Sequence, residues 1–151
     1  MMEFNPSKCQ IIPVTLKKKP VAAPYTIHGE TLDVVNSAKL LGVTTDSKLN
    51  FNEHVSAVSK KAHGTRAFLY CNIRTENRKI KAAACTTYVR PVVEYASTVW
   101  YSHMRKNVNK LEQVQRTSAR YVTNNHDYFS SMTQMLHDLQ WTTLADRRRV
   151  I

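Results

Sequence analysis

Glycine and cysteine are scarce in this sequence, at three residues each in 151. Three glycines are too few for a phosphate-cradling loop, and the Gly-x-Ser-x-Gly signature of many hydrolases is missing. Cys9, Cys71 and Cys85 are odd in number and widely spaced. This pattern argues against a disulfide framework and against a zinc site, and it predicts free, buried thiols.

Long hydrophobic runs are also lacking. No apolar stretch approaches the roughly 18 residues that span a membrane. The N-terminus, Met1–Pro6, has neither the basic head nor the apolar stretch of a signal peptide. We therefore expect an intracellular protein, nuclear or cytoplasmic, with no membrane partner. The hydrophobic content of 42% is still enough for one ordinary domain or for two small lobes.

Acidic residues are few compared with basic ones: 11 Asp and Glu stand against 22 Lys and Arg, a net charge of +11. Residues 1–51 carry six basic and four acidic residues (+2), residues 52–126 thirteen and four (+9), and residues 127–151 three and three (zero). Such a concentrated excess favours a polyanionic partner, with nucleic acid as the first candidate. A basic surface that serves only solubility is the alternative.

Short strands are predicted for about residues 8–46, where branched residues are interrupted by Pro and Gly. Cys9–Leu16 is predicted as one strand and Lys17–Lys19 as a solvated turn. A hairpin is predicted around Gly29. Lys39–Thr45 is predicted as the last strand, in which Gly42 indicates a bulge, the close approach of another backbone or a plain strand glycine. Together these segments predict a small antiparallel sheet.

From about residue 51 to residue 151, apolar residues recur at helical spacing and predict an α-helical bundle, so the expected fold class is α+β. Helix starts are predicted at capping residues, namely Asn50 with Glu53, Thr75, Ser102, Ser131 with Gln134, and Thr143 with Asp146. The inner face of the second helix is predicted to carry Ile80, Ala84 and Tyr88. Further along, Glu94 is expected to pair with Arg90.

Three segments are expected: a β lobe at 1–48, a basic helical bundle at 49–126 and short helices at 127–151. In the bundle, Arg66 is predicted to lie largely off the buried stripe of the first helix, and Tyr95 and Trp100 to be core anchors. The last helix stops after two turns without a cap, which predicts a truncated chain.

Five groups of residues follow one another along nearly the whole chain. They are Phe4–Gln10; Leu41–Gly42–Val43 with Leu49, Phe51 and His54–Val55; Arg90–Pro91 with Glu94–Ser97 and Trp100; Val114–Arg116 with Ala119–Arg120; and Leu139, Trp141, Leu144 and Arg147–Arg148. In this order and spacing they resemble the reverse transcriptase of non-LTR (LINE-type) retrotransposons, an RNA-directed DNA polymerase. The matching region resembles the end of the palm followed by the thumb.

The sequence departs from the family's pattern at three positions. Leu40 stands where the family usually has an aromatic residue, and Phe51 stands where it usually has Trp. Gln140 replaces a Gly that is expected after a short helix, where a left-handed C-cap favours Gly. That replacement is expected to cost about 1 kcal/mol of stability.

The resemblance implies that the catalytic Asp motifs, which would hold two metal ions, lie before Met1. Among the 11 acidic residues present no two are adjacent. We therefore expect this fragment to be no enzyme on its own and to hold no cofactor, although the complete polymerase would need Mg²⁺.

The resemblance also implies binding roles. Lys8 matches a palm lysine close to the phosphates of the incoming nucleotide, and Leu41, Gly42 and Val43 match the segment beneath the primer terminus. The thumb helices would follow the backbone of an RNA or DNA template–primer duplex without reading its sequence. The predicted contacts, as a set, are Lys60, Lys61, Arg66, Arg78, Lys79, Lys81, Arg105, Lys106, Lys110, Arg116 and Arg120.

Other functions stay open at this point. The missing fingers and palm of a complete reverse transcriptase are a second possible partner. The main alternative is a helical protein-interaction module, domesticated from the element or a relic of it, with no nucleic-acid role. An exposed apolar patch of several hundred Å² would favour that alternative.

Overall fold

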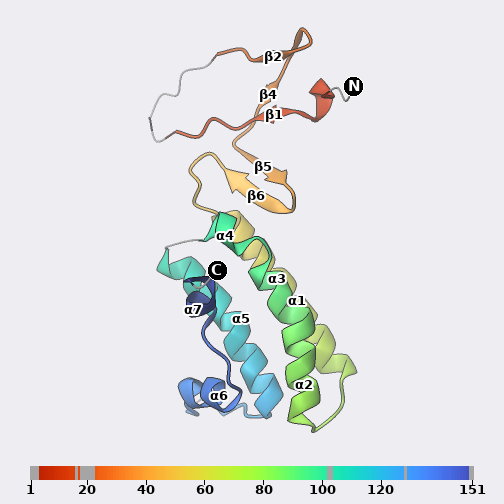
Figure 1. The fold of residues 1–151 in the computed structure, drawn as a ribbon, viewed down its shortest axis with the longest axis vertical. Coiled ribbons are helices and arrows are strands. Elements are labelled where there is room, and N and C mark those ends of the chain that lie inside the picture. Colours follow the sequence, from red (N-terminus) through yellow and green to blue (C-terminus); the bar gives the residue numbers. More distant parts are fainter. Residues whose placement is uncertain (1–3, 16, 18–22, 102–103, 128, 150–151) are drawn as a thin grey trace. The chain divides into compact units, whose positions relative to one another are not determined.

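The structure is a computed structural model that describes residues 4–15, 17, 23–101, 104–127 and 129–149. The chain divides into two compact units, Met1–Phe51 and Asn52–Ile151 (Figure 1). Short strands form the first unit and helices form the second, so the predicted α+β class is confirmed. Leu16, Lys18, Lys19 and Ser102, on which sequence predictions fell, lie outside the described residues. The three-segment division stays a prediction.

The first unit contains a 3₁₀ turn and three separate pairs of short strands. The elements are η1 (Pro6–Lys8), β1 (Gln10–Ile11), β2 (Thr26–Ile27), β3 (Glu30–Thr31), β4 (Asp33–Val34), β5 (Ser37–Leu40) and β6 (Val43–Asp46). The β2–β3 and β5–β6 pairs are antiparallel, as predicted. The β1–β4 pair is parallel, and the β2–β3 hairpin lies between these two strands in the chain.

Two-residue turns close both hairpins. His28 and Gly29 have φ angles of 51° and 81°, and Leu41 and Gly42 have φ angles of 48° and 85°. Positive φ at both central residues is the mark of a type I′ turn, which matches the twist of the flanking strands. Gly42 therefore lies in a turn, and the prediction of one strand through Lys39–Thr45 is wrong.

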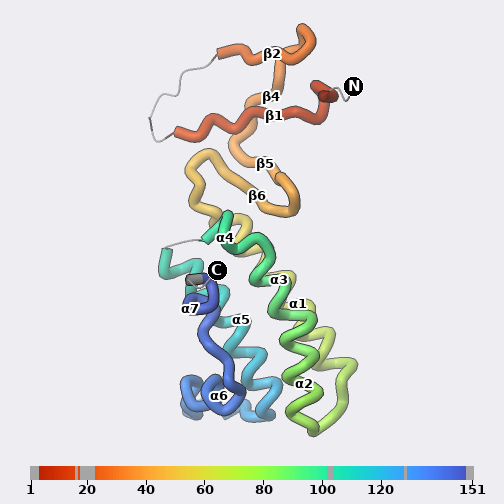
Figure 2. The backbone as a smooth tube through the Cα atoms, viewed as in Figure 1, coloured from red at the N-terminus to blue at the C-terminus, as the bar shows by residue number. Residues whose placement is uncertain are grey.

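The second unit is built from the helices α1 (Asn52–Asn72), α2 (Arg78–Ala84), α3 (Arg90–Glu94), α4 (Ser97–Trp100), α5 (Arg105–Thr123), α6 (Met132–Asp138) and α7 (Leu144–Arg149), with a π-helical turn, η2 (Cys85–Val89), between α2 and α3. The α1 and α5 helices run parallel and the α2–η2–α3 segment runs antiparallel to them, as the tube in Figure 2 shows. Buried apolar residues between these helices form the core, among them Val55, Ala62, Val93, Trp100, Val114 and Val122.

Hydrogen bonds fix the direction of the packed helices. Near the start of α1 and α5, Asn107 Nδ2 donates to Asn52 Oδ1 at 2.8 Å, and near their ends the Tyr121 hydroxyl donates to the Leu69 carbonyl at 3.3 Å. Conversely, Lys81 in α2 reaches Asn124, which follows the last residue of α5. Each of these polar contacts joins residues more than 40 positions apart, so they hold tertiary and not local structure.

The π-helical turn changes which residues of this segment face the core. The N–H of Arg90 donates to the carbonyl of Cys85, five residues back, immediately before Pro91, which has no N–H of its own. The predicted inner face is therefore right for Ala84 only, because Ile80 is 50% exposed and Tyr88 60% exposed. The buried positions instead recur every four residues, at Lys81, Cys85, Val89, Val93 and Ser97.

The helix caps agree only in part with the predictions. The second helix is capped by Asn77, whose side chain accepts from the N–H of Lys79 at 2.9 Å, and Thr75 instead accepts from the N–H of Asn77. Thr75 and Asn77 both belong to the residue types that cap helices well, so the sequence pattern alone did not distinguish the cap from its neighbour. The predicted caps of α6 and α7 are confirmed, since Ser131 accepts from the N–H of Gln134 and Thr143 from that of Asp146. The α1 helix begins at Asn52, two residues beyond the predicted cap.

The C-terminus of α6 ends in a Schellman motif. The N–H of Trp141 donates to the carbonyl of Leu136 at 2.8 Å, and the N–H of Gln140 donates to the carbonyl of His137 at 2.9 Å. Gln140 has a φ of 55°, so it occupies the left-handed position that usually belongs to Gly. The predicted left-handed conformation is confirmed.

We expect Gln140→Gly to raise the free energy of unfolding by about 1 kcal/mol, because Gly adopts a left-handed φ without the clash of a Cβ atom. Urea unfolding followed by circular dichroism measures the change. His137→Gly, at an exposed position with helical backbone in the same helix, should lower the free energy of unfolding by about 0.5–1 kcal/mol. A loss of stability in Gln140→Gly would contradict the expectation.

Candidate nucleic-acid interface

Most carboxylates of the basic segment bind groups inside the helical unit. Residues 52–126 contain four acidic residues. Glu94 forms an ion pair with Arg147, Glu112 accepts from the N–H of Ala145 at 2.9 Å, and Glu76 accepts from the side-chain amide of Asn124. These carboxylates join helices to one another. They leave the surface cations of the segment largely uncompensated.

Arg147 and Arg148 in α7 have structural partners. Both Arg147 and Glu94 are partly exposed, and a hydrogen bond from the Arg147 guanidinium to Glu94 raises the pKa of Arg147. Arg148 donates to the carbonyl of Val93 at 3.2 Å, and its guanidinium lies 5.3 Å from the ring centroid of Trp100. Burial lowers the pKa of Arg148, and the contact with the Trp100 ring offsets part of that cost. These arginines dock α7 onto α3.

Arg90 does not form the predicted ion pair with Glu94. Its guanidinium instead lies 5.2 Å from the ring centroid of Trp141, and the carboxylate of Glu94 turns to Arg147. Burial, and then the charge of Arg147, lower the pKa of Arg90. The i, i+4 spacing could not reveal a competing arginine more than 50 residues away.

The predicted contact residues fall into three groups by exposure. Those on the surface are Lys60, Lys61, Arg78, Lys79, Arg105, Lys106 and Arg116. Those half-buried are Arg66, Lys110 and Arg120. Lys81 is buried. The set therefore includes one residue, Lys81, that is not on the surface. Arg74, which is exposed and was not predicted, adds a further surface cation between α1 and α2.

Lys81 and Arg66 are poor candidates for binding a polyanion. Lys81 is 5% exposed, donates to the side-chain oxygen of Asn124 at 2.5 Å and lies 5.2 Å from the ring centroid of Tyr121. Arg66 lies one helical turn after the buried Ala62, and its Nε atom is buried. The prediction that Arg66 lies off the buried stripe is wrong. Both side chains belong to the packing of the unit.

Four cations follow one side of α5, and we name Lys106, Lys110, Arg116 and Arg120 the α5 basic stripe. With Gln113 between them, successive members are three or four residues apart, which keeps them on one side of a helix. Lys110 donates to the hydroxyl of Ser56 in α1 at 2.7 Å. Lys60 follows Ser56 by one helical turn. The stripe therefore borders α1, where it is extended by a further exposed lysine.

The first unit carries the remaining predicted site residues. Lys8 is exposed at the end of η1. Leu41 is 83% exposed at the tip of the β5–β6 hairpin, whereas Val43 is buried. A contact of Lys8 with nucleotide phosphates, and of the hairpin tip with a primer, stay predictions.

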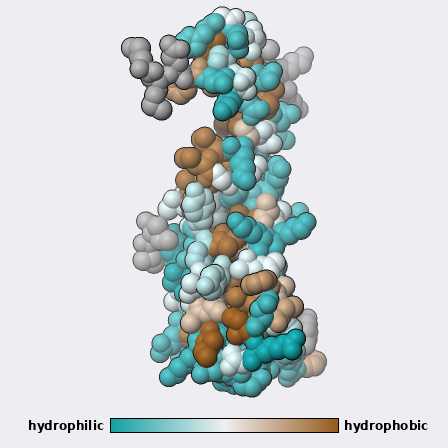
Figure 3. Space-filling view, turned by 90° about the vertical axis from the view of Figure 1, so that its right-hand side faces the viewer, coloured by the Kyte–Doolittle hydropathy of each residue, from teal (hydrophilic) through white to brown (hydrophobic). Residues whose placement is uncertain are grey.

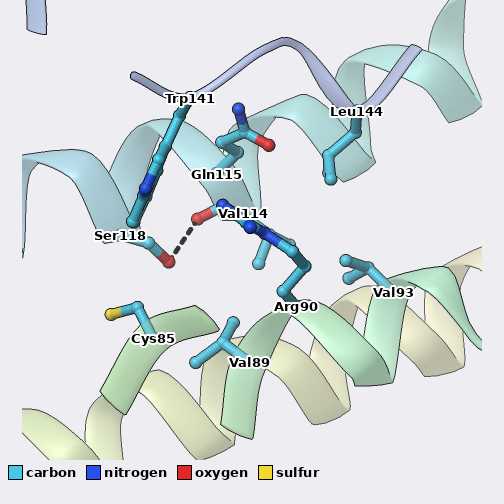
Figure 4. Close-up of a pocket in the computed structure, with 9 residues that line it drawn as sticks. All are labelled: Cys85, Val89, Arg90, Val93, Val114, Gln115, Ser118, Trp141 and Leu144. Carbon is cyan, nitrogen blue, oxygen red and sulfur yellow. Dashed lines mark hydrogen bonds between the residues drawn. The ribbon is translucent and has the colours of Figure 1, made fainter. Parts of the chain in front are cut away.

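A small cavity inside the helical unit holds the sulfur of Cys85 (Figure 4). Its volume of about 20 Å³ has room for about one water molecule. Ser118 donates to the carbonyl of Val114 at 2.8 Å in its wall. Burial raises the pKa of Cys85 to about 11, which keeps the thiol protonated at neutral pH. The prediction of buried thiols holds for Cys85 but not for Cys71, which is exposed.

Apolar residues interrupt the hydrophilic surface, as the brown patches in Figure 3 show on one face of the molecule. Ile80, Tyr88, Tyr95 and Val99 are each at least half exposed and belong to α2, η2 and the segment that follows. The prediction that Tyr95 is a core anchor is wrong, because Tyr95 is 59% exposed, although its carbonyl accepts from Trp100 Nε1 at 2.8 Å. Trp100 is fully buried, as predicted.

The described residues contain neither a cluster that could hold a metal ion nor a helix that could span a membrane. Within the described ranges, no three His, Cys, Asp or Glu side chains gather in a way that could hold a metal ion. The carboxylates present therefore do not fit the metal pair of a polymerase, and we derive no metal-dependent step for this chain. Of the helices described here, none combines the length and the hydrophobicity that crossing a membrane requires.

Comparison with known proteins finds transposon polymerases among the relatives of this chain. It is 27% identical over 151 residues to a probable RNA-directed DNA polymerase from transposon BS of Drosophila melanogaster, and 25% identical over 146 residues to one from transposon X-element of the same organism. The matches cover 97% and 95% of this chain but 17% and 16% of the two relatives. No family model matches the chain, and no solved structure matches it. The chain is thus a distant homologue of part of the RNA-directed DNA polymerases of non-LTR transposons.

Proposed function

We propose that this chain corresponds to the palm end and thumb of a non-LTR retrotransposon reverse transcriptase, and that its helical unit binds the backbone of a template–primer duplex without sequence preference. On its own the chain is not a polymerase. One observation carries the binding proposal: the carboxylates of residues 52–126 are largely engaged inside the helical unit, while Lys106 and Arg116 of the α5 basic stripe are exposed.

The chemistry of the α5 basic stripe fits a phosphate backbone. Arg and Lys side chains on a helix flank neutralise phosphates and release counterions, which supplies affinity without base recognition. Lys106 and Arg116 are exposed, and no ion pair occupies either of them in the described part of the chain. Their charges are therefore available to a polyanion.

Binding should depend steeply on salt. If the helical unit neutralises about four phosphates, the logarithm of the association constant should fall against the logarithm of the salt concentration with a slope of about −3 to −4. Fluorescence anisotropy with a labelled RNA–DNA duplex, between low and moderate salt, measures the slope. No binding at low salt, or binding that ignores salt, would refute the proposed function.

Charge reversal should locate the binding surface. We expect Lys106→Glu with Arg116→Glu to weaken duplex binding at least about tenfold, because two phosphate contacts become repulsive. Lys39→Glu with Lys48→Glu, which makes the same charge change at exposed positions of the first unit, should weaken binding less than about threefold. Equal losses in the two variants would show that net charge alone acts, and would contradict the assignment to α5.

A protein-interaction module is the second candidate, and the exposed side chains of Ile80, Tyr88, Tyr95 and Val99 favour it. The partner would be the remaining fingers and palm of a polymerase. Under this function, Tyr88→Ser with Tyr95→Ser would abolish association with a separately produced upstream segment, and the charge reversals on α5 would leave that association unchanged.

A further inference from the structure

A hollow of about 460 Å³ lies beside α5, along the loop that leads into α6. It is lined by Gln113, Arg116, Thr117, Arg120, Ser130 and Met132. Arg116 also borders a second hollow of about 240 Å³, which is lined by residues of α5, α6 and the start of α7. The first hollow thus opens beside the two arginines that end the α5 basic stripe.

The two arginines form an uncompensated pair of donors. Arg116 and Arg120 are one helical turn apart, a spacing at which like charges repel. Within the described ranges neither is ion-paired with a carboxylate. The Nε atom of Arg120 is buried and has no hydrogen-bond acceptor there. An anion held between the two guanidinium groups in the hollow would remove this repulsion.

The other polar groups around the hollow are occupied by their neighbours. The Ser130 hydroxyl lies 3.2 Å from Asn125 Oδ1 and 3.4 Å from Asp127 Oδ2, and Asp127 Oδ1 accepts from the N–H of Phe129. The Thr117 hydroxyl donates to backbone carbonyls of its own helix. Glu112, one turn before Arg116, accepts from the N–H of Ala145. The guanidinium groups of Arg116 and Arg120, together with the side-chain amide of Gln113, are therefore the donors left for a ligand.

The loop beside the hollow also presents an aromatic ring. Phe129 precedes Ser130 and is 92% exposed. Phe129 does not line the hollow itself, but it is the chain neighbour of Ser130, which does, so its exposed ring offers a surface on which a base of the bound strand can stack. The combination of this ring with the two arginines favours a nucleotide phosphate over the carboxylates of an acidic peptide.

We propose that this hollow is a phosphate subsite, in which the guanidinium groups of Arg116 and Arg120 hold one phosphodiester of a bound nucleic-acid strand. The subsite rests on the proposed function, because it takes its ligand from the strand that the helical unit binds. It goes beyond that function by assigning two residues to one phosphate. The fork of each guanidinium, and not only its charge, then contributes to binding.

The test replaces arginine by lysine, which keeps the charge and removes the bidentate fork. Arg116→Lys with Arg120→Lys should weaken binding of an RNA–DNA duplex at least about fivefold in fluorescence anisotropy, within the range of a lost charge-assisted hydrogen bond. Arg74→Lys, at an exposed position between α1 and α2 and outside the hollow, is the matched control and should change binding less than about twofold. Because Arg120 is half-buried, the exposed Arg116→Lys is also measured alone and should show part of the loss with unchanged thermal unfolding.

The outcomes separate the subsite from the function it rests on. If the wild-type chain binds the duplex and the double lysine variant binds equally well, the subsite is refuted and the proposed function stands. If the wild-type chain does not bind at low salt, the proposed function fails and the subsite fails with it. A loss confined to the variants that line the hollow supports both.

Discussion

The charge distribution of the helical unit depends on a few carboxylates that bind groups inside the unit. The ion pair of Glu94 with Arg147 and the hydrogen bond of Glu112 to the N–H of Ala145 hold α7 against α3 and α5. Glu76 likewise accepts from Asn124, beside the buried ammonium of Lys81. Because these acids stabilise the contacts between helices, they do not neutralise the outer side of α5. The same interactions thus support the fold and leave the surface positive.

The π-helical turn before Pro91 has a comparable double effect. By adding one residue to a helical turn, it keeps Cys85, Val89 and Val93 on the core side of a segment that proline would otherwise interrupt. It also turns Ile80 and Tyr88 toward the surface. The exposure of Tyr88, which lies within this turn, is therefore linked to how the segment accommodates its proline.

Sequence patterns predicted the local features better than the tertiary ones. The α+β class, the left-handed Gln140 and the caps Ser131 and Thr143 follow from short-range chemistry, and all were predicted. The burial of Trp100 was also predicted, from its large apolar side chain at a helical spacing. The partners of Glu94 and Lys81 lie more than 40 residues away in the chain, where periodicity has no information. The inner face of α2 was misassigned because the helical period itself changes at η2.

The candidate interface could be predicted only as a set of cations. Charge counts located the excess in residues 52–126, but they could not show that Lys81 and Arg66 face inward or that Arg116 and Arg120 share a hollow. Burial depends on the packing of α1, α2 and α5 together, and no single helix pattern contains it. Lys81 and Arg66 take part in the packing of the helices. The α5 basic stripe and its exposed neighbours are the cations that a polyanion can reach.

Lysine acetylation with and without a bound RNA–DNA duplex tests this account most directly, because it reports the accessibility of each ammonium group. The account predicts that Lys60 and Lys106 react in the free chain and are protected by the duplex, while the buried Lys81 stays unreactive in both states. Equal reactivity of Lys60 and Lys106 with and without duplex, or a Lys81 that reacts as readily as Lys79, would contradict it.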